Sequence, residues 1–182
     1  NIDIDYEISA PKNATLVVKS NSGTIHVDSI TGGGHAGTGS GDVFVNGIGT
    51  NSWLATSSGN LDIQGAQGTL LAKIGAGNLN IHDSDVTDAL LELGSGNITA
   101  TNLKGGVRAI TGKGDLTMAG SPTSEWELRT SNGAIRFQSD PNSRFELDAE
   151  AGAGTIDSTL PSPLSGHIAG GVLRGPVRGG GP

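Results

Sequence analysis

A short pattern of hydrophobic and polar positions recurs eight times along the chain. Each copy has a glycine, an apolar residue two positions later and usually another apolar residue four positions later, as in Gly23-Thr-Ile25-His-Val27. The intervals between glycines are 18 or 19 residues, with a last one of 21 residues, and the glycines are Gly23, Gly41, Gly59, Gly77, Gly96, Gly114, Gly133 and Gly154. A nearly fixed period of this length is typical of a solenoid, in which each repeat forms one coil stacked on the previous coil.

The alternation around each glycine predicts two strands per coil. Apolar residues at every second position indicate a strand with one buried face, both after the glycine and at seven and five positions before it. Five positions before, small and large residues alternate from coil to coil: Ala36, Leu54, Ala72, Leu91, Ala109, Leu128 and Ala149. Ile30, Ile48 and Leu103 indicate a short third side. The sequence therefore predicts an all-β fold, a parallel β-helix (β-solenoid) of about eight coils of 18–19 residues.

We interpret two further columns as structural. The eight repeat glycines are expected at corners between strands, where positive φ angles favour glycine. Directly after the glycine, Asn60, Asn78 and Asn97 fall on consecutive coils. Stacked asparagines can form hydrogen bonds along such a column, so we expect a polar ladder that supports the backbone rather than a ligand site.

The repeat divides the chain into three parts. Residues 12–161 form the predicted solenoid. Residues 1–11 form an N-terminal segment in which residues 2–8 alternate like an added strand before Pro11. Residues 162–182 are rich in glycine and proline and form either a cap or an incomplete last coil. An uncapped coil is an open sheet edge, which can pair with another chain.

Composition excludes several classes of function. The chain has 182 residues, enough for one domain, and its content of 34% hydrophobic and 3% aromatic residues suits a narrow coil. A net charge of −7 disfavours nucleic acid as a partner. There are no cysteines, hence no disulfide or thiolate metal site. No apolar run approaches the roughly 20 residues that cross a bilayer, and no signal peptide is present, so any export signal or anchor is expected to be removed or absent.

The charged residues provide no convincing catalytic or metal site. The densest cluster of carboxylates has arginines nearby and resembles cross-strand salt pairing more than an acid–base pair: Glu127, Arg129, Arg144, Glu146, Asp148 and Glu150. Asp83, Asp85 and Asp88 could attract a hard cation, but their loop lacks the glycine and closing glutamate of a dedicated calcium loop. The four histidines have no ligand spacing. We therefore expect no catalytic, cofactor-binding or metal-binding residues, and a protein that is not an enzyme.

One outward column is unusually apolar. Six positions before each glycine, five consecutive coils carry Val17, His35, Trp53, Leu71 and Leu90. We call these residues the apolar stripe. Soluble proteins seldom leave such a stripe bare. Either the N-terminal strand or the C-terminal tail covers it, or it binds a second protein, a glycan stacked on Trp53, or another copy of the chain.

The repeat Ser-Gly-[Asp/Asn]-[Ile/Val/Leu]-x-[Val/Ile] and the opening from Tyr6 to Ile25 resemble a bacterial family of adhesin-like β-solenoids, a domain-of-unknown-function group. The resemblance implies a right-handed, single-stranded parallel coil located outside the cytoplasm (periplasmic, cell-surface or secreted), with no catalytic residues. In that family a further coil follows a stretch like residues 179–182, so the last coil here is expected to be incomplete or supplied from elsewhere.

From these observations we expect a non-enzymatic, extracytoplasmic, adhesin-like binding or structural module without cofactors. Its expected partners are a surface glycan or protein. The alternative is a subunit of an extracellular filament that self-associates through open coil ends. A polysaccharide-active β-helix enzyme is the third possibility, disfavoured by the scatter of the acidic residues.

Overall fold

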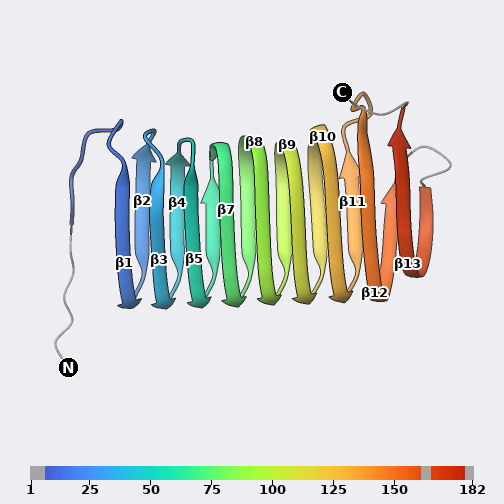
Figure 1. The fold of residues 1–182 in the computed structure, drawn as a ribbon, viewed down its shortest axis with the longest axis horizontal. Helices are drawn as coiled ribbons and strands as arrows, with labels where there is room; N and C mark the ends of the chain where they lie inside the picture. Colours follow the sequence, from blue (N-terminus) through green and yellow to red (C-terminus); the bar gives the residue numbers. More distant parts are fainter. Residues whose placement is uncertain (1–6, 161–164, 179–182) are drawn as a thin grey trace.

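The computed structural model describes the backbone of residues 7–160 and 165–178, and every regular element in that part of the chain is a β-strand. The strands stack side by side along the long axis of the molecule (Figure 1). They are β1 (Leu16–Ser22), β2 (Ile25–Ile30), β3 (Gly34–Ser40), β4 (Val43–Ile48), β5 (Ser52–Ser58), β6 (Leu61–Gln64), β7 (Gln67–Ala76), β8 (Leu79–Ser95), β9 (Ile98–Lys113), β10 (Leu116–Asn132), β11 (Ile135–Ser139), β12 (Phe145–Thr159) and β13 (Ser165–Val177). Among the residues described, none belongs to a helix of the length and apolarity that a membrane span requires.

Strands pair in parallel with the equivalent strand of the next coil, which confirms the predicted β-solenoid of about eight coils. On one face, β1, β3, β5 and β7 pair in succession and continue into the later parts of β8, β9 and β10 and the first part of β12. On the other face, β2, β4 and β6 continue into the first parts of β8, β9 and β10 and then β11. We call the first the stripe face, because it carries the apolar stripe, and the second the ladder face.

The core lies between the two faces and follows the predicted columns. The alternating small and large residues from Ala36 to Ala149 are all buried, as are Ile30, Ile48 and Leu103 of the short third side. Near the C-terminal end the core becomes aromatic. Trp126 is fully buried, with its ring centroid 5.2 Å from that of Phe137, and its Nε1 donates a hydrogen bond to the carbonyl oxygen of Gly105 (2.7 Å).

Most corner glycines are required by close stacking as well as by backbone conformation. Gly154 lacks the positive φ expected of all eight, and an added Cβ atom at Gly23 would meet no other atom. Gly77 has φ of +143°, and a Cβ atom there would overlap the carbonyl oxygen of Gly59 in the coil before. A buried threonine hydroxyl also uses such a carbonyl, because Thr56 donates to the carbonyl oxygen of Gly41 (3.0 Å). The corners therefore stack backbone on backbone, which leaves no room for a side chain.

The C-terminal segment covers the last coil. After β12 the chain reverses, and β13 pairs antiparallel with β12 on both faces, from Phe145↔Val177 on one to Thr159↔Ser165 on the other. All other strand pairs of the described residues are parallel. Of the two interpretations of the tail, the described part, residues 165–178, corresponds to a cap.

The N-terminal end is different. Most of the strand predicted over residues 2–8 lies outside the described residues; residues 7–10 have no regular structure, and Ile8 is 73% exposed. A turn at residues 11–14 is held against the second coil, because the Thr31 amide donates to the carbonyl oxygen of Lys12 (2.6 Å). Within the described residues, β1 pairs only with β3 and β2 only with β4, so the first coil has an open edge.

Candidate binding surfaces

The apolar stripe forms one continuous column on the stripe face. Strand register places Val17, His35, Trp53, Leu71 and Leu90 opposite one another on consecutive coils. Val17 is 65% and Trp53 42% exposed, His35 is exposed, and the two leucines are half-buried. The rings of His35 and Trp53 meet edge to face with centroids 5.2 Å apart. The stripe is thus an ordered surface of aliphatic and aromatic groups.

No described segment covers this stripe. The expectation that the C-terminal tail does so is wrong for residues 165–178, because β13 pairs with β12 at the opposite end of the rod. At the N-terminal end, residues 7–13 are themselves exposed. The neighbouring outward column carries Gly37 and Ala55 beside Trp53, so the stripe is flat there. Beside Leu71 and Leu90 the same column carries Lys73 and Glu92, whose Nζ and Oε2 atoms lie 3.2 Å apart in an ion pair.

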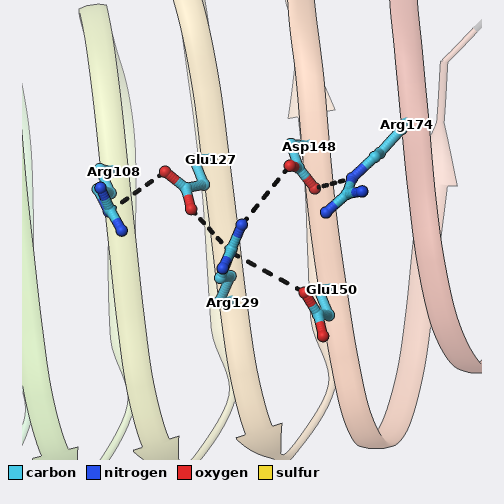
Figure 2. A network of polar contacts seen from close by, with 6 residues as sticks. All are labelled: Arg108, Glu127, Arg129, Asp148, Glu150 and Arg174. Carbon is cyan, nitrogen blue, oxygen red and sulfur yellow. Dashed lines mark hydrogen bonds and ion pairs between the residues drawn. The ribbon is translucent and has the colours of Figure 1, made fainter.

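Farther along the stripe face the same column becomes charged. Figure 2 shows a chain of ion pairs that runs from β9 to β13. Arg108 Nε lies 3.2 Å from Glu127 Oε2, Arg129 Nε lies 2.7 Å from Glu127 Oε1, and Arg129 Nη2 lies 3.7 Å from Asp148 Oδ2. Arg174 on β13 completes the chain, with Nε donating a hydrogen bond of 2.7 Å to Asp148 Oδ1. The ion pairs join the antiparallel cap to the coils beneath it.

This arrangement confirms the predicted salt pairing of Glu127, Arg129, Asp148 and Glu150, the last 4.0 Å from Arg129 Nε. The Arg129 Nε–H is buried and forms no hydrogen bond of acceptable geometry despite the short distance to Glu127, so that contact is an ion pair only. The hydrogen bond from Arg174 to Asp148 raises the pKa of Arg174 above its ordinary value. Arg144 and Glu146 are exposed and outside this network.

The polar ladder on the ladder face is longer than its three asparagines. Asp42 Oδ1 accepts from the Asn60 amide (2.6 Å), and Asn60 Oδ1 accepts from the Asn78 amide (3.0 Å). Asn78 Oδ1 then accepts from the Asn97 amide (3.0 Å), and Asn97 Oδ1 from the Asp115 amide (2.8 Å). Each side chain therefore binds the backbone of the next coil. Direct amide-to-amide bonding occurs between Asn78 Nδ2 and Asn60 Oδ1 (3.3 Å).

Asp115 ends the ladder. Its Oδ1 accepts from the Ala134 amide (2.8 Å), and its Oδ2 accepts from Arg136 Nη1 (3.1 Å). The hydrogen bond from the Ala134 amide and then that from the Arg136 guanidinium lower the pKa of Asp115 from its ordinary value of 3.8. The ladder is thus fixed at this end by a charged pair.

An aromatic pair on the ladder face was not among the residues expected from the sequence to form a surface. Three positions after the corner glycine, His26 and Phe44 stack with ring centroids 4.9 Å apart and planes 11° from parallel. Phe44 is 39% exposed. The repeat does contain the signal, since aligning the glycines places the two rings in one column on consecutive coils.

The candidate cation loop does not bring its carboxylates together. Asp83 Oδ1 accepts a hydrogen bond from Asn102 Nδ2 (2.7 Å), which links two coils. Among the side chains that the structure describes, residues 7–160 and 171–178, no group of three histidines, aspartates or glutamates has the arrangement of a metal site. These aspartates therefore form an ordinary polar corner.

Comparison with known proteins gives one match. A family model described as Toastrack DUF4097 matches residues 49–167, about two thirds of the chain. No curated protein and no solved structure matches it at a significant level.

Proposed function

The chain belongs to the Toastrack DUF4097 family, and we propose that it is a non-enzymatic, adhesin-like binding module that works outside the cytoplasm. The observation that carries this proposal is the apolar stripe, which no described segment covers and which lies on a regular solenoid face. Isolated exposed apolar residues are common, but a contiguous exposed row marks an interaction site. The extracytoplasmic location rests on the resemblance to adhesin-like solenoids and agrees with the absence of cysteine.

The chemistry of the stripe favours a protein as its occupant. A sugar ring that stacks on Trp53 would need hydrogen-bonding groups for its hydroxyls; Gly37 and Ala55 in the adjacent column offer none, and Lys73 farther along that column is paired with Glu92. A protein segment with an apolar face requires no such groups and would bury Trp53 together with Leu71 and Leu90. Aromatic residues at the centre of an interface commonly dominate its binding energy.

The absence of enzymatic activity is part of the proposal. The acidic residues that lie closest together, Glu127, Asp148 and Glu150, are engaged by Arg129 and other guanidinium groups. In these ion pairs the carboxylates face guanidinium groups of the same chain, not a substrate. We therefore assign this network to attachment of the cap.

Filament assembly remains the alternative, favoured by the open edge of the first coil among the described residues. At the other end β13 runs antiparallel to the coils and contains Pro176, which has no amide N–H to donate to a further strand. Parallel coils therefore do not simply continue past β13, and this asymmetry supports a discrete module over a polymer.

The proposal is tested by measuring how tightly the labelled chain binds to two kinds of intact cells. One kind is the organism that encodes the chain, and the other is the cells on which that organism grows. Trp53→Ser is compared with Ser57→Ala, a matched control on the same face of β5. We expect saturable binding that Trp53→Ser weakens by about thirtyfold, the effect of losing a residue worth about 2 kcal/mol. Protease treatment of the cells should weaken binding of the unaltered chain to a similar degree. Equal binding by Trp53→Ser, or loss only after periodate oxidation of glycans, would contradict the proposal.

A further inference from the structure

The ladder face has a groove on its outer surface that the apolar stripe does not explain. It lies along the rod axis between two outward columns, one at the residues directly before β4, β6, β8 and β9 and the other in the first parts of these strands. One side is the ladder, Asp42, Asn60, Asn78 and Asn97; the other is Phe44, Asp62, Asn80 and Thr99. The two columns are two residues apart on each strand, so a ligand in the groove would contact both.

The ladder side of the groove is preorganised. Each carboxylate or amide oxygen along it is held by the backbone amide of the next coil at 2.6–3.0 Å. These bonds fix the side chains without using the second oxygen of Asp42 or all of the amide protons. Asn97 Nδ2, for example, donates to no described residue. The ladder therefore presents fixed donors and acceptors at the coil spacing of about 4.8 Å, and little side-chain freedom is lost on binding.

The opposite side has polar groups without partners. Asp62, Asn80 and Thr99 are half-buried, and within the described part of the chain their side chains form no hydrogen bond or ion pair. In the ladder, by contrast, one oxygen of each side chain already accepts a hydrogen bond. These three groups are available to a ligand that supplies both donors and acceptors.

An aromatic ring stands at one end of the groove. His26 stacks against one face of Phe44 and fixes the orientation of the ring. On the other side of Phe44 the next coil has the shorter Asp62, and both residues line the groove. The arrangement gives an apolar ring beside a carboxylate and amides, the combination that orients a polar ligand with an apolar face.

Charge narrows the ligand class. The groove lining contains two aspartates and no lysine or arginine. An anionic ligand would be repelled, and no group of described histidine or carboxylate side chains has the geometry of a metal site. A ligand with hydroxyl groups, an apolar ring face and no negative charge fits all three features of the site.

We infer that this groove binds a neutral saccharide, with one sugar ring stacked near Phe44 and the hydroxyls of successive units bonded to Asp62, Asn80 and the ladder. The inference adds a second binding face to the proposed module. It does not depend on the stripe, since the two surfaces lie on different faces and are altered by different substitutions.

The test is an NMR titration of the isotope-labelled full chain, in the presence of a metal chelator, with short neutral oligosaccharides of glucose, mannose, galactose and N-acetylglucosamine. Oligogalacturonate serves as the anionic counterpart. We expect at least one neutral oligosaccharide to shift the amide resonances of β4, β6 and the first parts of β8 and β9, and oligogalacturonate to leave them unchanged. A panel without any such shift, or shifts caused only by the anion, would overturn the inference.

Substitutions localise the effect. Phe44→Ser and Asp62→Ala should each weaken saccharide binding about tenfold or more, equivalent to about 1.4 kcal/mol. Asn46→Ala is the matched control, an exposed outward residue of β4 outside the groove lining. Unchanged affinity in both groove variants, with native circular dichroism, would also overturn the inference. Trp53→Ser should leave saccharide binding intact, which separates failure of this inference from failure of the proposed function.

Discussion

Replacing Trp126 by phenylalanine tests how the aromatic, C-terminal end of the core is built. Trp126 is fully buried, and its Nε1–H bonds the carbonyl oxygen of Gly105, a buried residue of the preceding coil. Phenylalanine cannot donate, so this carbonyl loses its side-chain donor at a cost of about 1–3 kcal/mol. The smaller ring also loses apolar contact and leaves a void, which adds roughly 1 kcal/mol. We expect the free energy of unfolding to fall by about 2–4 kcal/mol.

The measurement is urea unfolding followed by far-ultraviolet circular dichroism, since tryptophan fluorescence would itself change. For a slope of about 2 kcal/mol per molar urea, the midpoint should fall by about 1–2 M. Trp53→Phe is the natural control because these are the two tryptophans of the chain and Trp53 is 42% exposed. That control should change stability by less than about 0.5 kcal/mol. Equal midpoints for the two variants would refute the assignment of Trp126 to the core.

Three further predictions concern the corners, the ladder and the cap. Gly77→Ala should prevent folding or strongly lower the midpoint of a thermal melt, because the new Cβ atom would overlap the carbonyl oxygen of Gly59. Gly37→Ala is the control: its Cβ atom would lie 3.4 Å from the nearest atom, so this variant should melt close to the wild type. Asp115 has a lowered pKa in the folded state, so its contribution to stability is present above pH 3.8 and is lost as the pH falls through the folded-state pKa. The difference in unfolding free energy between the wild type and Asp115→Asn should therefore shrink on acidification. A difference that does not change with pH would contradict this. Asp148→Asn should accelerate hydrogen exchange in β13 more than in β9, and high salt should reduce this difference. Lys73→Gln, which breaks the pair with Glu92, should leave β13 unchanged.

Much of the fold could be predicted because a solenoid repeats its constraints. The column from Ala36 to Ala149 and the corner glycines are enough to predict the strand register, since each coil must bury the same positions as its neighbours. The apolar stripe and the salt pairing around Arg129 follow from the same alignment of repeats. Trp126 falls in a buried column of that alignment, although its hydrogen bond to Gly105 depends on side-chain geometry that the alignment does not contain.

The ends and the groove could not be predicted in the same way. β13 leaves the repeat, and its glycine- and proline-rich sequence does not reveal that it turns back antiparallel on β12; the role of Arg174 depends on that reversal. The groove depends on two columns together, whereas the repeat draws attention to the asparagine ladder alone. Whether Asp62 and Asn80 have partners is a property of side-chain geometry that the repeat pattern does not encode.

The size and shape of the purified chain across a concentration series test the account most directly, because a binding module must be a discrete particle. Light scattering and negative-stain microscopy should give a short particle of constant length, since the antiparallel β13 ends the stack of parallel coils. Rods of uniform width that lengthen with concentration would contradict the account and make filament assembly the function of the solenoid.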